Sequence, residues 1–302
     1  MRFIVEYPVV STPGAGWLEP ASITRFARAV EEAGLDGIGF TDHPAPSLKW
    51  LNGGGHETFD PFAALGFCAA VTTRIRLLTW LSVVPYRNPF LAAKSMTTVD
   101  LVSGGRATFA LGSGYLRSEF AALGVDFSER NDLFEESVRV MKATWTGDEV
   151  SFEGRHFRAI GQVGRPRPVQ RPHPPLWIGG NSAVARDRVA RLAQGWAPMR
   201  GPKLLARTTR TPAIESTEEL GRLVEDLARR LDAAGRSLKE IDIVAGAEGG
   251  RLTSEMSGEQ RLESFAEIER IGVTVTSVQV PRDSVQAATE AVARFGQDVL
   301  GQ

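Results

Sequence analysis

The sequence predicts a (β/α)₈ barrel, or TIM barrel, with inserted loops at the carboxyl ends of its strands. Short apolar segments alternate with helical segments along nearly the whole chain of 302 residues. The apolar runs lack polar alternation, as expected for parallel strands that are covered on both faces. No linker-like segment separates two halves, so we expect one domain over residues 1–302. A doubly wound open sheet is the alternative.

The first half of the chain alternates regularly. Arg2 to Tyr7 predicts the first strand, and Pro20 opens a helix that ends at Gly34. The pattern continues with strands at 37–42, 75–84, 107–111 and 174–178, and with helices that begin at 60 and span 89–101, 130–145 and 182–192.

The second half shows the same alternation with a weaker pattern. Ser216 and Glu219 form a capping signature ahead of a helix with a leucine-rich face. We expect the remaining strands at 196–199, 241–245 and 274–280, and helices at 258–271 and 283–300. These segments bring the total to eight strand-helix units.

Two segments do not fit this alternation. Residues 43–58 and 147–173 are long, irregular and rich in proline and glycine. Ordered insertions at the strand ends of a barrel commonly form the walls or lid of a substrate site. We therefore expect both segments to cover the substrate.

Composition excludes several classes of partner. The chain has 35 Lys and Arg against 36 Asp and Glu, so no basic field is available to hold nucleic acid. No apolar run is long enough to span a membrane, and the amino terminus lacks the pattern of a signal peptide, so we expect a cytoplasmic protein. The single cysteine, Cys68, lies in an apolar run and is interpreted as a buried hydrophobe rather than a nucleophile. No cluster has metal-ligand spacing, so we expect no metal.

Polar residues at strand ends are candidates for the active site. His43 follows the second strand, where an imidazole can exchange a proton near neutral pH; a histidine that caps the following turn is the alternative. Trp50 and His56, in the first insertion, are candidates for contact with substrate, with simple loop packing as the alternative.

The loop Gly112-Ser113-Gly114-Tyr115 follows the fourth strand. Its glycines permit close approach to a planar ring, and Tyr115 can stack or donate a hydrogen bond. The loop lacks the third glycine of a dinucleotide fingerprint. Glu119, one helical turn later, is expected to pair with a neighbour such as Arg117.

The loop Gly179-Gly180-Asn181-Ser182 joins the fifth strand to a helix. Free amides at a helix start, with the helix dipole, form an anion site; a simple capped turn is the alternative. Arg200 and Lys203 are basic residues near the barrel mouth, and we interpret them as solvated surface more readily than as an anion site.

Several segments together resemble the luciferase-like monooxygenase superfamily, and within it the branch that uses the deazaflavin coenzyme F420. They are AVEEAGLDGIGFTDHP, PYRNPFLAAKSMTTVDLVSGGR, GSGYLRSEFAALGVDFSER, FEESVRVMKATWTG and RPHPPLWIGGNS. Their order and spacing match over most of residues 20–200. The resemblance implies a barrel with insertions, which agrees with the alternation of elements.

The resemblance also implies roles for individual residues. His43 would lie against the reactive ring as proton donor or acceptor, and loop 179–182 would hold the coenzyme phosphate. A non-prolyl cis peptide is implied within Trp80, Leu81 and Ser82, where a bulge presses on the ring. The F420-dependent sugar-phosphate dehydrogenases carry a glutamate near the position of Tyr115, so their acid role does not transfer to this chain.

We therefore expect an F420-dependent oxidoreductase that transfers a hydride between the deazaflavin and a small organic substrate. One alternative is an FMN-dependent two-component monooxygenase, which uses oxygen and takes reduced flavin from a separate flavin reductase. A non-catalytic binding barrel is the other. By analogy with the family we expect a homodimer.

Overall fold

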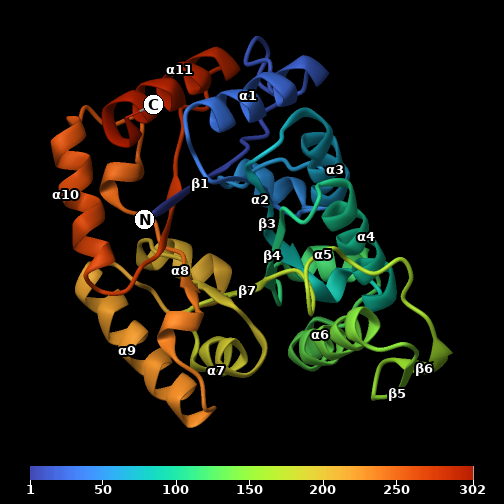
Figure 1. The fold of residues 1–302 in the computed structure, drawn as a ribbon. Coiled ribbons are helices and arrows are strands. Elements are labelled where there is room, and N and C mark those ends of the chain that lie inside the picture. Colours follow the sequence, from blue (N-terminus) through green and yellow to red (C-terminus); the bar gives the residue numbers. More distant parts are fainter. Residues whose placement is uncertain (302) are drawn as a thin grey trace.

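The computed structural model describes residues 1–301 and confirms the predicted barrel (Figure 1). Eight parallel strands form one sheet in the order β10-β1-β2-β3-β4-β7-β8-β9. A parallel bridge joins Val244, just after β9, to Val275 of β10, and the amide of Ala245 donates to the carbonyl of Val275 at 3.1 Å. The sheet is therefore nearly closed, and the open doubly wound alternative was wrong. The strands are β1 (Arg2–Glu6), β2 (Gly37–Phe40), β3 (Arg76–Val83), β4 (Ala107–Gly112), β7 (Leu176–Gly179), β8 (Gly195–Ala197), β9 (Asp242–Ile243) and β10 (Val275–Val278).

Helices surround this sheet in a ring (Figure 1). The long ones are α1 (Pro20–Glu32), α3 (Pro61–Val71), α4 (Pro89–Val102), α6 (Arg130–Thr146), α7 (Ala183–Leu192), α9 (Thr217–Ala233), α10 (Gly258–Glu269) and α11 (Val285–Phe295). The short ones are α2 (Leu48–Asn52), α5 (Arg117–Ala122) and α8 (Lys203–Thr209). Single 3₁₀ turns lie at Val84–Tyr86, Phe127–Glu129, Leu238–Glu240 and Glu248–Gly250, and a π-helical turn at Gly296–Leu300.

Local sequence signals set the helix starts. Proline occupies the first turn of α1, α3 and α4, where its missing N–H costs nothing. Asp60 and Asn88 cap α3 and α4 by accepting from backbone amides. The predicted capping box of α9 is present, with Ser216 and Glu219 each bonding the other's backbone.

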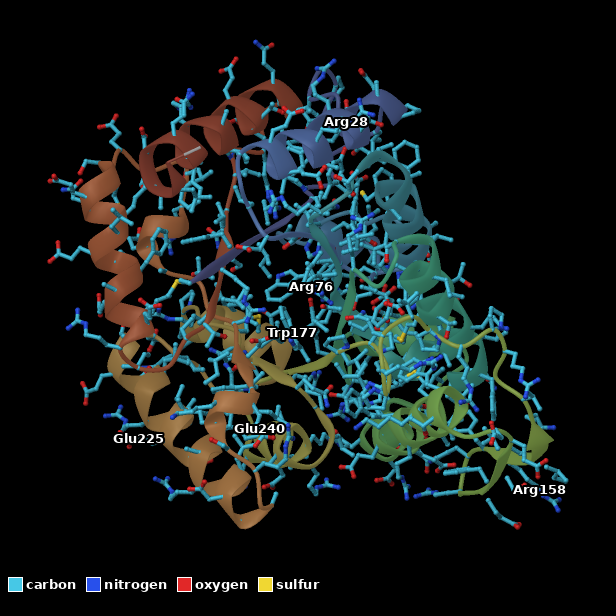
Figure 2. The ribbon with its side chains drawn as sticks, in the orientation of Figure 1. Arg28, Arg76, Arg158, Trp177, Glu225 and Glu240 are labelled. Atoms are coloured by element: carbon cyan, nitrogen blue, oxygen red, sulfur yellow. The ribbon has the colours of Figure 1, made fainter. Side chains whose placement is uncertain are left out.

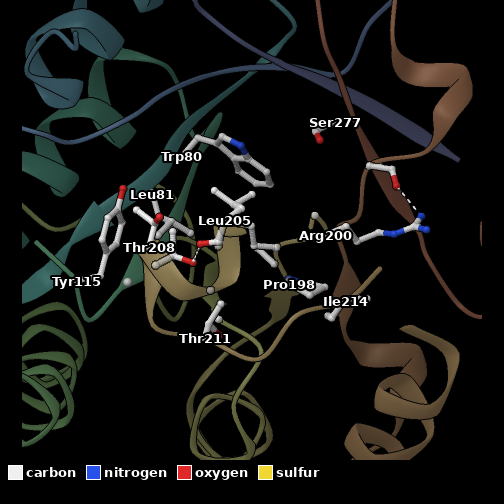
Figure 3. Close-up of a pocket in the computed structure, with 18 of the residues that line it drawn as sticks. Trp80, Leu81, Tyr115, Pro198, Arg200, Leu205, Thr208, Thr211, Ile214 and Ser277 are labelled. Atoms are coloured by element: carbon white, nitrogen blue, oxygen red, sulfur yellow. Dashed lines mark hydrogen bonds between the residues drawn. The ribbon is translucent and has the colours of Figure 1, made fainter. Parts of the chain in front are cut away.

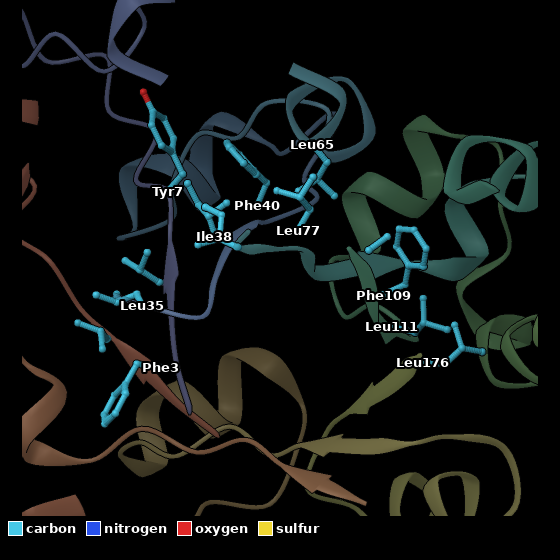
Figure 4. Close-up of a cluster of buried hydrophobic side chains, with 14 of the residues drawn as sticks. Phe3, Tyr7, Leu35, Ile38, Phe40, Leu65, Leu77, Phe109, Leu111 and Leu176 are labelled. Atoms are coloured by element: carbon cyan, nitrogen blue, oxygen red, sulfur yellow. The ribbon is translucent and has the colours of Figure 1, made fainter. Parts of the chain in front are cut away.

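Two layers of buried apolar side chains hold the barrel. The larger lies between strands and helices, and includes Phe3, Tyr7, Phe40, Leu77, Phe109 and Leu176 (Figure 4). The smaller fills the barrel interior and includes Ile4, Leu78, Ala110, Trp177, Val244 and Val275. Figure 2 shows Arg76 and Trp177 inside the ring of helices, whereas Arg28, Arg158 and Glu225 project from its outer side.

The boundaries of several elements differ from prediction. β7 starts at Leu176 and not at residue 174, because Pro174 and Pro175 have no N–H to donate and the pairing with β4 begins at Leu176. β9 contains Asp242 and Ile243 alone, since the next residues turn toward β10. The last predicted helix divides into α11 and the π-helical turn.

The two insertions lie at opposite ends of the barrel. Residues 43–58, with α2, cover the carboxyl ends of the strands. Residues 147–173 include a hairpin of β5 (Val150–Glu153) and β6 (Arg158–Gln162) that projects away from the barrel (Figure 1). Gln170 bonds the carbonyl of Ala107 at the amino end of β4. The prediction that this second insertion covers the substrate was wrong, because a segment between a helix and the next strand lies at the amino ends.

Candidate active site

A cavity of about 1290 Å³ occupies the carboxyl ends of the strands. Of the residues that the sequence singled out, His43, Trp50, His56, Trp80, Leu81, Gly112, Ser113, Gly114, Tyr115, Gly179, Gly180 and Ser182 line it. Ser82 and Asn181 do not. Figure 3 shows Tyr115 and Leu81 on one side of the cavity, with Ser277 and Arg200 on the other.

His43 contacts a buried carboxylate. Its Nδ1 lies 3.0 Å from Oε2 of Glu119, whose side chain is fully buried. The same oxygen accepts from the hydroxyl of Tyr86 at 2.9 Å, and Oε1 accepts from the amide of Ala45 at 3.1 Å. Glu119 therefore does not pair with Arg117, and that prediction was wrong. Glu119 lies only one turn after the Gly112 loop, but nothing local in the sequence specifies a partner in the segment that follows β2.

The charge of Glu119 sets the proton position on His43. Burial alone raises the pKa of this carboxyl, but the hydrogen bonds from His43, Ala45 and Tyr86, with the charge of His43, bring the pKa below its ordinary value. An ionised carboxylate only accepts hydrogen bonds, so Nδ1 of His43 carries the proton. Nε2 is then the ring nitrogen without a proton, and it is available to a molecule bound in the cavity.

The first insertion packs aromatic rings around His43. The ring of Trp50 lies 4.6 Å from the His43 ring, that of His56 5.2 Å and that of Tyr115 5.9 Å, between centroids. Burial, with the charges of His43 and Arg282, lowers the pKa of His56 to about 4, so His56 is neutral at pH 7. Its Nε2 is buried and has no hydrogen-bond partner among residues 1–301.

Asp42 fixes the end of β2 against β3. Its buried carboxylate accepts two hydrogen bonds from the guanidinium of Arg87, at 2.6 and 3.0 Å. It also accepts from the amide of Val83 and the hydroxyl of Ser82. Ser82 is therefore buried behind the cavity and supports Asp42, so its predicted contact with a coenzyme is not available. This network positions His43, the next residue along.

Leu81 forms the floor of the cavity. The peptide bond between Trp80 and Leu81 is cis, which confirms the expectation of a non-prolyl cis peptide in this segment. A Cβ atom at Gly112 or at Gly179 would lie 2.6 Å from a methyl carbon of Leu81. These two glycines therefore make room for Leu81, which in turn presents an apolar surface to the cavity.

The turn between β7 and α7 has the features of an anion site. Gly180 has a φ of 106°, which glycine adopts readily, and Ser182 caps α7 by accepting from the amide of Ala185 at 3.2 Å. The backbone amides of residues 183 and 184 lie in the first turn of α7, so they have no hydrogen-bond acceptor within the helix. Residues 180, 182, 184 and 185 line the cavity, where such amides can bind an anion. Asn181 differs from prediction, because its side chain bonds backbone groups of Met199 and Pro212.

Three arginines gather beside this turn around the ring of Phe127. The guanidinium carbons of Arg130, Arg117 and Arg210 lie 4.0, 4.5 and 5.4 Å from the ring centroid. None of the three has a carboxylate within 4 Å among residues 1–301. Burial and the neighbouring guanidiniums lower the pKa of Arg130. No local sequence pattern predicts this cluster, since its members come from α5, α6 and the end of α8.

The wall opposite the first insertion was also missed. It comes from residues 198–215, which include α8, and places Leu205, Thr208 and Thr211 over the cavity (Figure 3). Arg200 belongs to this wall and donates to the carbonyl of Gly246, so it is not solvated surface as predicted. Within residues 1–301 no group of three or more His, Cys, Asp or Glu side chains could hold a metal ion.

Comparison with known proteins identifies the family. Residues 1–248 match the model of the luciferase-like monooxygenase family. The chain belongs to this family. An F420-dependent glucose-6-phosphate dehydrogenase of Amycolatopsis mediterranei is 28% identical over 291 residues, 91% of this chain and 84% of the relative. An FMNH₂-dependent dimethylsulfone monooxygenase of Pseudomonas putida is 31% identical over 173 residues, 56% of this chain but only 44% of that enzyme.

Solved structures of other proteins share the fold. A coenzyme F420-dependent tetrahydromethanopterin reductase of Methanopyrus kandleri superimposes with a TM-score of 0.76 at 16% identity, over 99% of this chain and 98% of that one. A monooxygenase of Streptomyces bottropensis gives a TM-score of 0.76 at 20% identity, over 100% and 99% of the two chains. These relatives are oxidoreductases and monooxygenases, and their names include both F420 and reduced FMN. No helix within residues 1–301 is long and apolar enough to cross a membrane.

Proposed function

We propose that this protein is a coenzyme F420-dependent oxidoreductase acting on a small organic substrate. The observation that carries the proposal is the arginine cluster of Arg117, Arg130 and Arg210 beside the anion-binding turn. Three guanidiniums without carboxylate partners repel one another, so their proximity is stabilised when an anion binds. The amides of the turn would hold one phosphate, so the cluster favours a coenzyme with a further acidic tail.

The residues present fit such a coenzyme. Leu81 offers an apolar seat for a planar ring, and the turn at Gly180 and Ser182 offers amides to a phosphate. Arg130 and Arg210 line the same cavity as that turn, so they could contact a tail that continues from the phosphate. When bound, the deazaflavin would supply the site that accepts or donates a hydride.

The chain's own residues would then manage the proton and exclude water. His43, held through Nδ1 by Glu119, presents Nε2 to the cavity, where it takes up the proton that the substrate loses in oxidation and returns it in reduction. Trp50 packs against His43 and reduces the access of water. Tyr115 stays protonated, since burial raises its pKa to about 12.

The test is a titration of the purified protein with each coenzyme. We expect F420 to bind more tightly than FMN, whether oxidised or reduced, and more tightly than the deazaflavin core without its acidic tail. Arg130→Gln with Arg210→Gln should remove most of the preference for the tailed form. Tight preferential binding of reduced FMN with oxygen-dependent turnover would refute the proposal, as would failure to bind either coenzyme.

A homodimer and a cytoplasmic location stay predictions. Light scattering at micromolar concentration tests the first, and a monomer would contradict it.

A further inference from the structure

Strand register divides the upper layer of the barrel interior into two halves. Along β1, Ile4 packs in the interior, and the next residue on that face is Glu6. Along β10 and just after it, Val275 is followed on the same face by Ser277 and then Gln279. Glu6, Ser277 and Gln279 therefore form a polar half of the cavity wall, which we call the polar half.

The opposite half is apolar. Between β3, β4 and β7, the inward positions are occupied by Leu81 and the glycines that accommodate it, Gly112 and Gly179. Figure 3 shows Ser277 across the cavity from Leu81 and Tyr115. A planar coenzyme ring on Leu81 would therefore have the polar half beside it and not beneath it.

The side chains of the polar half have free hydrogen-bonding capacity. Among residues 1–301, Glu6, Ser277 and Gln279 make no side-chain hydrogen bond, although each lines the cavity. Glu6 has one charged neighbour, Arg282, whose Nη2 lies 3.9 Å from Oε1 of Glu6. This distance is too long for a hydrogen bond. Glu6 is not solvated surface, since its side chain is only 28% exposed. Ser277 is partly buried like Glu6, whereas Gln279 is exposed. Unpaired polar groups that line a cavity are completed by a polar ligand or water.

We propose that the polar half is the substrate subsite, and that Glu6, Ser277 and Gln279 bind a small neutral molecule bearing a hydroxyl or carbonyl group. This inference rests on the proposed function for the place of the coenzyme. Neutrality follows from the charges, because Glu6 and Arg282 offset each other at the same wall. The subsite offers both donors and acceptors, which suit a hydroxyl or carbonyl oxygen.

Burial also raises the pKa of Glu6, against the opposing charges of Arg282 and His43. His56, whose buried Nε2 lacks a partner, faces the same cavity and supplies a further polar contact.

The experiment uses cyclohexanol, cyclohexanone and cyclohexanecarboxylate as probes, with binding followed by NMR of the Trp80 indole N–H. The wild-type protein should bind the alcohol and the ketone about tenfold more tightly than the carboxylate. Glu6→Leu should weaken binding of both neutral probes about 5- to 10-fold, as the loss of one hydrogen bond predicts. Glu6→Gln keeps a donor and an acceptor and should retain most of the binding.

Controls separate the subsite from folding and from the coenzyme. Glu263→Leu makes the same change at an exposed carboxylate on α10, outside the cavity, and should leave probe binding unchanged. Ser277→Val tests the same subsite from β10 and should weaken the neutral probes as well. F420 affinity, titrated in each variant, should stay within about twofold of wild type.

The outcomes are distinct. Unchanged probe binding in both Glu6→Leu and Ser277→Val would overturn the inference, as would a wild-type protein that binds the carboxylate best or binds no probe. Equal losses in Glu6→Gln and Glu6→Leu would overturn the role of hydrogen bonding. Probe binding that follows the expected pattern in a protein that binds no F420 would support the subsite and refute the proposed coenzyme.

Discussion

Replacing Glu119 with glutamine is a direct test of how His43 is controlled. Glutamine has the shape of glutamate, but it replaces one acceptor oxygen with a donor NH₂ group. Oε1 faces the amide of Ala45, which can only donate, so placing NH₂ there breaks a buried hydrogen bond. At Oε2 the NH₂ group faces the hydroxyl of Tyr86 and Nδ1 of His43, and both can become acceptors. We expect glutamine to adopt this second orientation.

The consequence is a change of tautomer. To accept from the glutamine NH₂, Nδ1 of His43 must lose its proton, and the neutral ring then carries its proton on Nε2. The site loses a charge-assisted hydrogen bond of about 1.5–3 kcal/mol. General acid–base catalysis contributes about 10²–10⁴ in rate, so we expect kcat of the F420-dependent reaction to fall by that order. The fold should survive, because every buried group retains a partner.

Two measurements check this expectation. Nitrogen-15 NMR of the imidazole reports which ring nitrogen of His43 is protonated, and needs no substrate. The free energy of unfolding, measured at several pH values, reports whether Glu119 is ionised. The folded-state pKa lies below the ordinary 4.5, so ionised Glu119 contributes stability above that pH, and the contribution is lost as pH falls below it. Glu119→Gln should remove this part of the acid sensitivity.

Tyr86→Phe is the matched control, because it removes one hydrogen bond to Glu119 and leaves the carboxylate charge in place. It should cost about 1 kcal/mol and leave the proton on Nδ1 of His43. If Glu119→Gln also keeps the Nδ1 proton, or loses no activity, the argument from buried charge is refuted.

Three further predictions follow from the cavity. Gly179→Ala places a Cβ atom 2.6 Å from a methyl carbon of Leu81, so it should destabilise the fold by about 1–3 kcal/mol and weaken F420 binding; an unchanged Tm would contradict this. Arg130→Gln and Arg210→Gln should each weaken F420 binding about tenfold and reduce its salt dependence without loss of stability, as calorimetry at two salt concentrations can show. The pKa of His56 is lowered to about 4, so the unfolded chain binds more protons between pH 4 and 6.5, and stability should rise with pH across that range. His56→Gln should flatten that part of a stability-pH curve, and a curve that keeps its slope would refute the assignment.

The barrel, and the end of it that carries the site, could be predicted from the amino-acid sequence. Apolar runs without polar alternation specify strands covered on both faces, and helical segments between them leave few topologies. Because parallel strands all end at the same face, residues that follow them, such as His43, Tyr115 and Gly179, meet there whatever the details of packing. These signals are local, so they can be read without coordinates.

The partners of those residues became visible in the folded molecule. Glu119 lies 76 positions from His43, and its role depends on α5 coming close to the segment that follows β2. Gly112 and Gly179 are explained by Leu81, a residue on a third strand, and the arginine cluster joins three separate elements. The sequence places Glu6 within a predicted strand, but it does not show that the side chain points into the barrel or that the carboxylate has no hydrogen-bond partner. Periodicity encodes which face of an element is buried, whereas the charge and hydrogen-bonding partners of a site are set by contacts between elements distant in sequence.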